Sequence, residues 1–159
     1  MPADTPPIVA CMADILISGT VNRFSLAKAW EKGLVEVIEP FNDYAAHLET
    51  MIDFATIKER EISVVVDAMF GAGISYLEEL LGRHDCKVTA IHNWRDLLFG
   101  GSLPEPSANH LHQLCQAVRE RKAELGVALD GDADRLGVVD PEGRYYSPNE
   151  ILVLFWLIW

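Results

Sequence analysis

The chain has 159 residues, half of them hydrophobic, and a formal net charge of -11 at pH 7. That length allows one domain with a proper core plus a fragment of a neighbour, and the apolar content predicts a folded chain. The acidic charge argues against binding of nucleic acid, but not against a phosphorylated substrate at a site where a metal ion or an arginine reverses the local sign. Its three cysteines include no Cys-x-x-Cys pair, which is typical of a reducing compartment.

The first 33 residues do not read as a domain of their own. The apolar run Ile8–Ile17 has no basic segment before it and contains Asp14, so it fits a signal peptide poorly. The stretch Ser25–Lys32 predicts a short helix with a serine cap, ended by Gly33. We expect residues 1–33 to be a remnant of a preceding domain or a linker from it.

Helical and strand patterns alternate from Asp43 onward. Apolar residues recur at helical spacing from Tyr44 to Ala55, which predicts one amphipathic helix. The β-branched run Ile62–Asp67 predicts a buried strand, a helix is expected over residues 74–81, and Lys87–Ile91 predicts a second strand. This order is typical of a β-α-β unit.

A short glycine loop, Gly71-Ala-Gly73, joins the first strand to its helix. Such a loop suggests a nucleotide site, but Tyr76 replaces the third glycine of Gly-x-Gly-x-x-Gly and no Gly-Lys-Ser/Thr follows. We therefore interpret the glycines as a tight turn onto the helix.

The second half of the chain continues the alternation. Ser107 is predicted to cap a helix whose apolar stripe runs from Leu111 to Val118. Leu125–Leu129 and Leu136–Val139 then predict two strands, and their connection is too short for a crossover helix, so they are expected to be antiparallel. The whole pattern predicts a three-layer α/β/α domain.

The connection between these last two strands contains the candidate functional residues. It reads Asp130-Gly-Asp-Ala-Asp-Arg135, and side chains at alternate positions of such a loop can converge on one point. Three carboxylates held together repel one another unless a cation lies among them, and Mg²⁺ prefers such oxygen ligands. Arg135 adds a planar fork suited to phosphate or carboxylate. The loop therefore predicts a magnesium site at Asp130, Asp132 and Asp134.

Three other interpretations of the loop compete with this one. A solvated acidic turn is disfavoured because apolar strands flank it on both sides. An EF-hand requires Gly at its sixth position and Glu at its twelfth, where this chain has Arg135 and Pro141. A haloacid-dehalogenase-like phosphatase also places an Asp-x-Asp loop after an apolar strand, but its fifth position is normally Thr or Val rather than Asp134. The phosphatase stays open as an alternative.

Three stretches together resemble one known family. They are Val66–Gly73, Phe99–Pro106 and the aspartate loop, and in this order they resemble the second domain of the α-D-phosphohexomutases, the phosphoglucomutase and phosphomannomutase family. The resemblance implies an α/β domain over residues 34–147 with a mixed, mostly parallel four-stranded sheet. It also implies that residues 148–159 are the truncated start of a following domain.

The resemblance implies a function as well. The family moves a phosphoryl group between the 1- and 6-hydroxyls of a hexose through a bisphosphate, using a phosphoserine on its first domain. Asp130, Asp132 and Asp134 would then be Mg²⁺ ligands, Arg135 a catalytic residue that stabilises phosphate, and the parent protein a cytoplasmic isomerase of phosphorylated hexoses. No family-like serine, sugar-binding or phosphate-binding loop is found in this chain. We expect the isolated chain to be inactive, and a non-catalytic metal-binding fragment is the alternative.

The final nine residues, Ile151–Trp159, are all apolar. As a helix they would span about 13–14 Å at the standard rise, far short of a bilayer core of roughly 30 Å. We therefore expect no membrane crossing. A helix that is apolar on every side is normally covered on every side, so we expect the segment to fold back on its domain or to drive self-association.

Overall fold

The computed structural model describes residues 5–19, 21 and 23–158, with only the backbone of Ile158, and the chain divides into two compact units, Met1–Glu39 and Pro40–Trp159. The first unit contains α1 (Thr5–Ser18) and α2 (Leu26–Glu31), neither of which has a buried residue. The hydroxyl of Ser25 caps α2 by accepting the N–H of Lys28 at 3.3 Å, as predicted. Sequence patterns gave no helix at α1.

The second unit is built on a five-stranded sheet in the order β2-β1-β3-β4-β5. Its strands are β1 (Ser63–Asp67), β2 (Lys87–Ile91), β3 (Leu125–Leu129), β4 (Leu136–Val139) and β5 (Tyr145–Tyr146). The β1 strand is parallel to β2 and β3, whereas β3, β4 and β5 pair antiparallel. The prediction of a four-stranded, mostly parallel sheet was therefore wrong in two respects. The sheet has a fifth strand, β5, and with β5 it has as many antiparallel pairs as parallel ones. A strand of two residues is too short to show a period.

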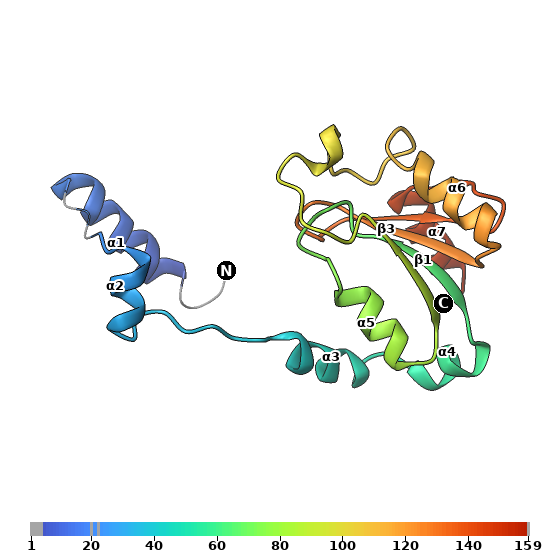
Figure 1. Cartoon of the computed structure of the whole chain (residues 1–159), viewed down its shortest axis with the longest axis horizontal. Helices are drawn as coiled ribbons and strands as arrows, with labels where there is room; N and C mark the ends of the chain where they lie inside the picture. Colours follow the sequence, from blue (N-terminus) through green and yellow to red (C-terminus); the bar gives the residue numbers. More distant parts are fainter. Residues whose placement is uncertain (1–4, 20, 22, 159) are drawn as a thin grey trace. The chain divides into compact units, whose positions relative to one another are not determined.

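Helices lie on both faces of the sheet (Figure 1). On one face α6 (His112–Arg121) buries Leu114 and Val118 against Val65, Ala128 and Val139. On the other face lie α3 (Phe41–Glu49), α4 (Phe54–Arg60) and α5 (Tyr76–Arg83), whose Phe41, Ala45, Phe54 and Leu80 form a second cluster. The sequence thus correctly indicated an α/β/α arrangement.

Two predicted helix boundaries were wrong. The single helix expected from Tyr44 to Ala55 is broken into α3 and α4, because the Asp53 carboxylate accepts the N–H groups of Ala55 and Thr56 and starts a new helix. Ser107 does not cap α6, which begins at His112; its hydroxyl lies 3.2 Å from the Nδ1 atom of His110 instead.

The register brings three strand ends to one edge. Asp67, the last residue of β1, pairs with Ile91 at the end of β2 and with Ala128 near the end of β3. The chain leaves the central β1 for β2 on one side and reaches β3 on the other, which makes this edge a topological switch point. Ligands of open α/β sheets bind in the crevice at such a point.

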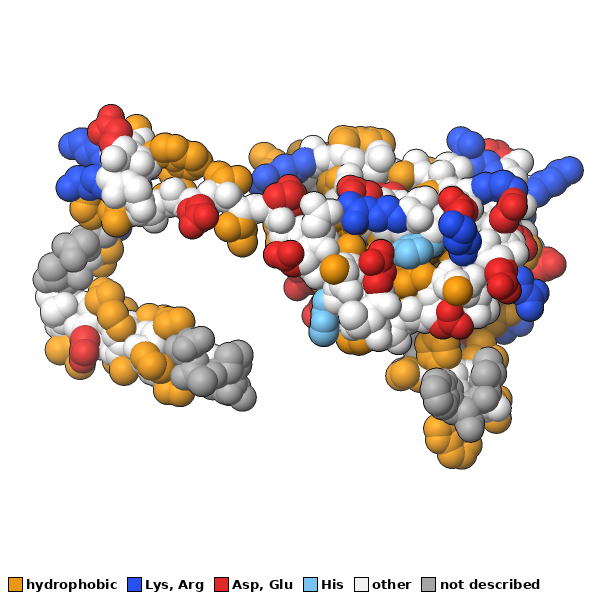
Figure 2. All heavy atoms as spheres, turned by 90° about the horizontal axis from the view of Figure 1, so that it is seen from below, with side chains coloured by type: hydrophobic (Ala, Val, Ile, Leu, Met, Phe, Trp, Pro, Cys, Tyr) orange, Lys and Arg blue, Asp and Glu red, His pale blue; other side chains and the backbone are white. Residues whose placement is uncertain are grey.

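The chain ends in the apolar helix α7 (Pro148–Ile158). Ser147 and Glu150 form a capping box, in which the Glu150 carboxylate accepts the Ser147 N–H at 2.8 Å. All six side chains from Leu152 to Leu157 are exposed, and hydrophobic side chains gather on this projection of the domain (Figure 2). Among the described residues, no helix is both long and apolar enough to cross a membrane. Trp159 lies outside the described residues.

Candidate metal centre

The structure brings the three predicted aspartates together in the loop between β3 and β4. One carboxylate oxygen from each of Asp130, Asp132 and Asp134 lies within 4.8 Å of the other two. The loop turns tightly because Ala133 adopts φ 62° and its N–H donates to the Asp130 carbonyl at 3.1 Å. The three side chains can therefore reach one ion.

Asp130 is the fixed member of the cluster. It is only 1% exposed, and its Oδ1 atom accepts the N–H groups of Asp134 at 2.9 Å and Arg135 at 3.0 Å. Its Oδ2 atom accepts Arg135 Nε at 2.8 Å. Burial acts to raise the pKa of Asp130, but the hydrogen bonds from Arg135 and Asp134 outweigh it and lower that pKa. This carboxylate is therefore ionised at neutral pH.

The other two aspartates are exposed and repel one another. The negative charge of Asp132, followed by that of Asp130, raises the pKa of Asp134. A cation at the point where the three carboxylates converge would remove this repulsion. Hard oxygen donors with open neighbouring positions suit Mg²⁺, which keeps several waters or phosphate oxygens in its shell. The donor set thus fits a divalent cation.

Arg135 is held from two sides. Besides its bond to Asp130, one terminal nitrogen, Nη1, lies 3.1 Å from Oε1 of Glu105. The Arg135 side chain is still 55% exposed, and its guanidinium retains N–H groups for an incoming anion. Sequence patterns did not single out Glu105, because no local spacing relates residues 30 positions apart; its place in Pro104-Glu-Pro106 was the only signal.

Two other loops fix the backbone of the aspartate loop. The Ala72 N–H donates to the Gly131 carbonyl at 2.9 Å, and the Gly131 N–H donates to the Pro104 carbonyl at 3.1 Å. A Cβ atom on Gly71 would lie 2.7 Å from the Gly131 oxygen. Gly71 is therefore required for the close approach of two backbones, a role that the tight-turn interpretation missed. The three stretches that carried the family resemblance meet at this place.

Comparison with known proteins identifies the fold of the domain. The family model for the phosphoglucomutase/phosphomannomutase α/β/α domain II matches residues 42–143. A protein of Methanothermobacter thermautotrophicus, described as a probable phosphoglucosamine mutase, is 35% identical over 129 residues, which are 80% of this chain and 28% of that protein. A phosphopentomutase of Thermococcus kodakarensis is 32% identical over 144 residues, covering 91% of this chain and 30% of the relative.

A solved structure agrees with these relatives. The crystal structure of a Thermus thermophilus protein, described as a phosphomannomutase, superposes with a TM-score of 0.71 at 30% identity, over 77% of this chain and 29% of that one. The chain thus spans less than a third of each of these proteins. The family match includes strands β1 to β4 and the aspartate loop, and the chain belongs to the phosphoglucomutase/phosphomannomutase family, of which it carries the α/β/α domain II.

Proposed function

We propose that this chain is the metal-binding domain of a phosphohexomutase, which interconverts hexose 1-phosphate and hexose 6-phosphate through a phosphoserine and a bisphosphate. The observation that carries the proposal is the convergence of Asp130, Asp132 and Asp134 at the switch-point edge of this family's domain II. In this proposal the three carboxylates hold Mg²⁺, which neutralises charge on the oxygens of the transferred phosphoryl group.

The protein's own residues prepare the site for a phosphate. Asp130 keeps Arg135 in place through the Nε bond, while Glu105 holds the same guanidinium from the other side. The exposed N–H groups of Arg135 can then donate to phosphate oxygens, and a guanidinium fork is well matched to them. Arg135 is thus the catalytic residue that we propose for this domain.

The isolated chain is proposed to be inactive. Carboxylates and a metal ion do not replace the covalent phosphoserine of the transfer, and the sequence contains no family-like serine loop. We place the choice of sugar outside this domain as well, since its relatives are described as acting on phosphoglucosamine and on phosphopentoses. Viewed alone, the chain is a metal-binding fragment, and we place its parent protein in the cytoplasm.

The phosphatase alternative requires a free carboxylate as nucleophile. Asp130 follows β3 where such a nucleophile would lie, but it is buried and both its oxygens accept hydrogen bonds. Those bonds lower its nucleophilicity, whereas its Oδ2 atom, which accepts one hydrogen bond, keeps a lone pair that can ligate a metal ion. The geometry therefore favours a metal ligand over an aspartyl nucleophile.

A domain exchange tests the proposal. Residues 42–143 are placed in the corresponding part of the Methanothermobacter thermautotrophicus relative, and turnover of its sugar phosphate is measured. We expect activity in the chimera, loss of activity with Asp132→Asn, and no loss with the matched control Asp43→Asn in the first turn of α3. Activity that survives Asp132→Asn would refute the proposed role of the loop.

The isolated chain provides the opposing test. It is assayed with glucose 1-phosphate and, separately, with p-nitrophenyl phosphate in Mg²⁺. We expect no turnover of either compound. Mutase turnover would contradict the proposed inactivity, and hydrolysis that disappears in Asp130→Asn would establish the phosphatase instead.

A further inference from the structure

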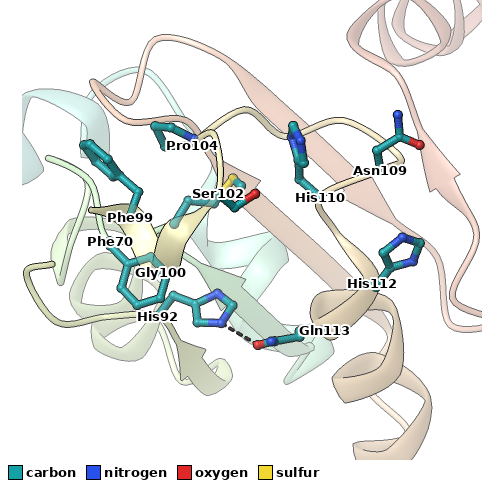
Figure 3. Close-up of a pocket in the computed structure, with 11 residues that line it drawn as sticks. Phe70, His92, Phe99, Gly100, Ser102, Pro104, Asn109, His110, His112 and Gln113 are labelled. Atoms are coloured by element: carbon teal, nitrogen blue, oxygen red, sulfur yellow. Dashed lines mark hydrogen bonds between the residues drawn. The ribbon is translucent and has the colours of Figure 1, made fainter. Parts of the chain in front are cut away.

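A second chemical cluster lies at the same edge of the sheet, outside the metal centre. A cavity of about 240 Å³ opens between the ends of β1 and β2, the segment around Phe99 and the start of α6 (Figure 3). Among the described residues that line it, only the histidines are titratable: His92, His110 and His112. The described lining has no carboxylate to hold a hard cation, whereas the N–H groups of its histidines can donate to the oxygen atoms of an anion.

His92 is held between two oxygen atoms. Its Nδ1 atom lies 2.9 Å from Oδ1 of Asp67, which is 1% exposed and also accepts the Met69 N–H at 2.8 Å. Its Nε2 atom lies 2.6 Å from Oε1 of Gln113 (Figure 3). Because a carbonyl oxygen only accepts, Nε2 donates its hydrogen to Gln113 Oε1, and the Asp67 carboxyl group fixes the ring from the Nδ1 side.

The second hydrogen bond marks a position for a ligand. Gln113 is exposed and belongs to the first turn of α6, so its side chain can turn away without disturbing the core. An anionic oxygen in its place would form a charge-assisted bond with His92, which is about twice as strong as a bond to a neutral acceptor. Asp67, in contrast, is buried and fixes the ring from behind.

Backbone strain is concentrated around the same cavity. Met69, Phe70, His92 and Phe99 all line it and all have φ between 45° and 60°. These are four of the nine non-glycine residues with positive φ in the described part of the chain. Such conformations are unfavourable for residues other than glycine and cluster at binding sites. Here the Phe70 N–H donates to the His92 carbonyl at 3.0 Å and holds two of them in place.

We propose that this cavity is a binding site for a small oxyanion, a phosphoryl or carboxylate group, one oxygen of which displaces Gln113 Oε1 from His92 Nε2. Phe70, whose ring is tilted by 31° against that of His92 with ring centroids 4.6 Å apart, forms an apolar wall. His112 also lines the cavity, but its ring turns away from His92 (Figure 3). The proposal does not depend on mutase function, although the cavity and the aspartate loop share Pro104 as a neighbour.

The test follows the histidine ring nitrogens of the full ¹⁵N-labelled chain by NMR. The protein is kept at about pH 6, just below the ordinary histidine pKa, without divalent cations and at constant ionic strength. Inorganic phosphate and sodium acetate are titrated separately, which distinguishes the two sources of an oxyanion. We expect the ring nitrogens of His92 to show a saturable shift with one or both anions.

Two substitutions at Gln113 are expected to act in opposite directions. Gln113→Glu places a carboxylate on His92 and lowers anion affinity by about tenfold or more, which is the scale of one charge-assisted hydrogen bond. Gln113→Ala removes the competing acceptor and raises affinity several-fold. His47→Gln, at an exposed position on α3, leaves affinity unchanged.

Three results would overturn the proposal. One is a His92 ring that does not respond to either anion. Another is a response shared equally by His47, which would mean non-specific ion binding. The third is equal affinity in the parent chain, Gln113→Glu and Gln113→Ala, with backbone spectra showing that all three are folded.

Discussion

Gly71→Ala tests the claim that the glycine loop exists to let two backbones approach. The added Cβ atom would lie 2.7 Å from the Gly131 oxygen, 2.9 Å from the Asp130 oxygen and 2.9 Å from the Gly131 Cα atom. All three are backbone atoms, so no side chain can rotate away. Overpacking of this kind costs about 1–3 kcal/mol, and the bond from the Ala72 N–H to the Gly131 carbonyl contributes about 1 kcal/mol more if it breaks. We expect a loss of about 3 kcal/mol in the free energy of unfolding.

The assay is urea denaturation followed by circular dichroism. With a slope of about 1.5 kcal/mol per molar urea, the midpoint would fall by about 2 M. The control is Gly82→Ala, because Gly82 lies within α5 and a Cβ there meets nothing within 4 Å. That change removes a helix glycine and is expected to stabilise the domain by about 0.5 kcal/mol. Equal midpoints for the two variants would refute the reasoning.

Three further predictions concern charge and association. Both carboxylate oxygens of Glu78 are enclosed, and burial raises the pKa of Glu78 more than nearby backbone N–H groups lower it. A raised pKa in the folded state means that stability is lost as the pH rises through it. Glu78→Gln is therefore expected to stabilise the domain by about 1 kcal/mol at neutral pH and by less in acid. Urea denaturation at both pH values would measure the difference. The lowered pKa of Asp130 stabilises the folded state, and this stability is lost as the pH falls through that pKa. Arg135→Met removes part of this stability, so the melting temperature of the variant is expected to lie below that of the parent chain at neutral pH and to approach it below about pH 4. A difference in melting temperature that grows below this pH would contradict the prediction. Because α7 exposes its apolar side chains, we expect the full chain to self-associate in sedimentation experiments and a chain ending at Glu150 to be monomeric; a monomeric full chain with water-exposed Trp156 emission would contradict this.

The parts of the fold that the sequence predicted are those with a local signal. The runs Ser63–Asp67 and Leu125–Leu129 are β-branched or apolar over a whole strand, and the turn between β3 and β4 is short enough to force antiparallel pairing. The break between α3 and α4 was missed because the apolar spacing continues across it. The signal for a new helix start is a single capping residue, Asp53, which the spacing does not reveal.

The candidate site was partly predictable for the same reason. The aspartates lie within five residues, so their convergence follows from local spacing. Glu105, His92 and Gln113 act through contacts that form only when distant segments fold together, and nothing in their sequence surroundings relates them to Asp130 or Asp67. Gly71 was visible in the sequence, but the backbone that it approaches was not.

The central claim is that Asp130, Asp132 and Asp134 form one divalent-cation site, and a Mg²⁺ titration followed by backbone NMR tests it most directly. We predict saturable shifts confined to residues 130–135 and their hydrogen-bonded neighbours, with weak affinity because no substrate phosphate completes the shell. The shifts are expected to vanish in Asp132→Asn and to persist in Asp43→Asn. Shifts that avoid residues 130–135, or that survive Asp132→Asn unchanged, would contradict the account.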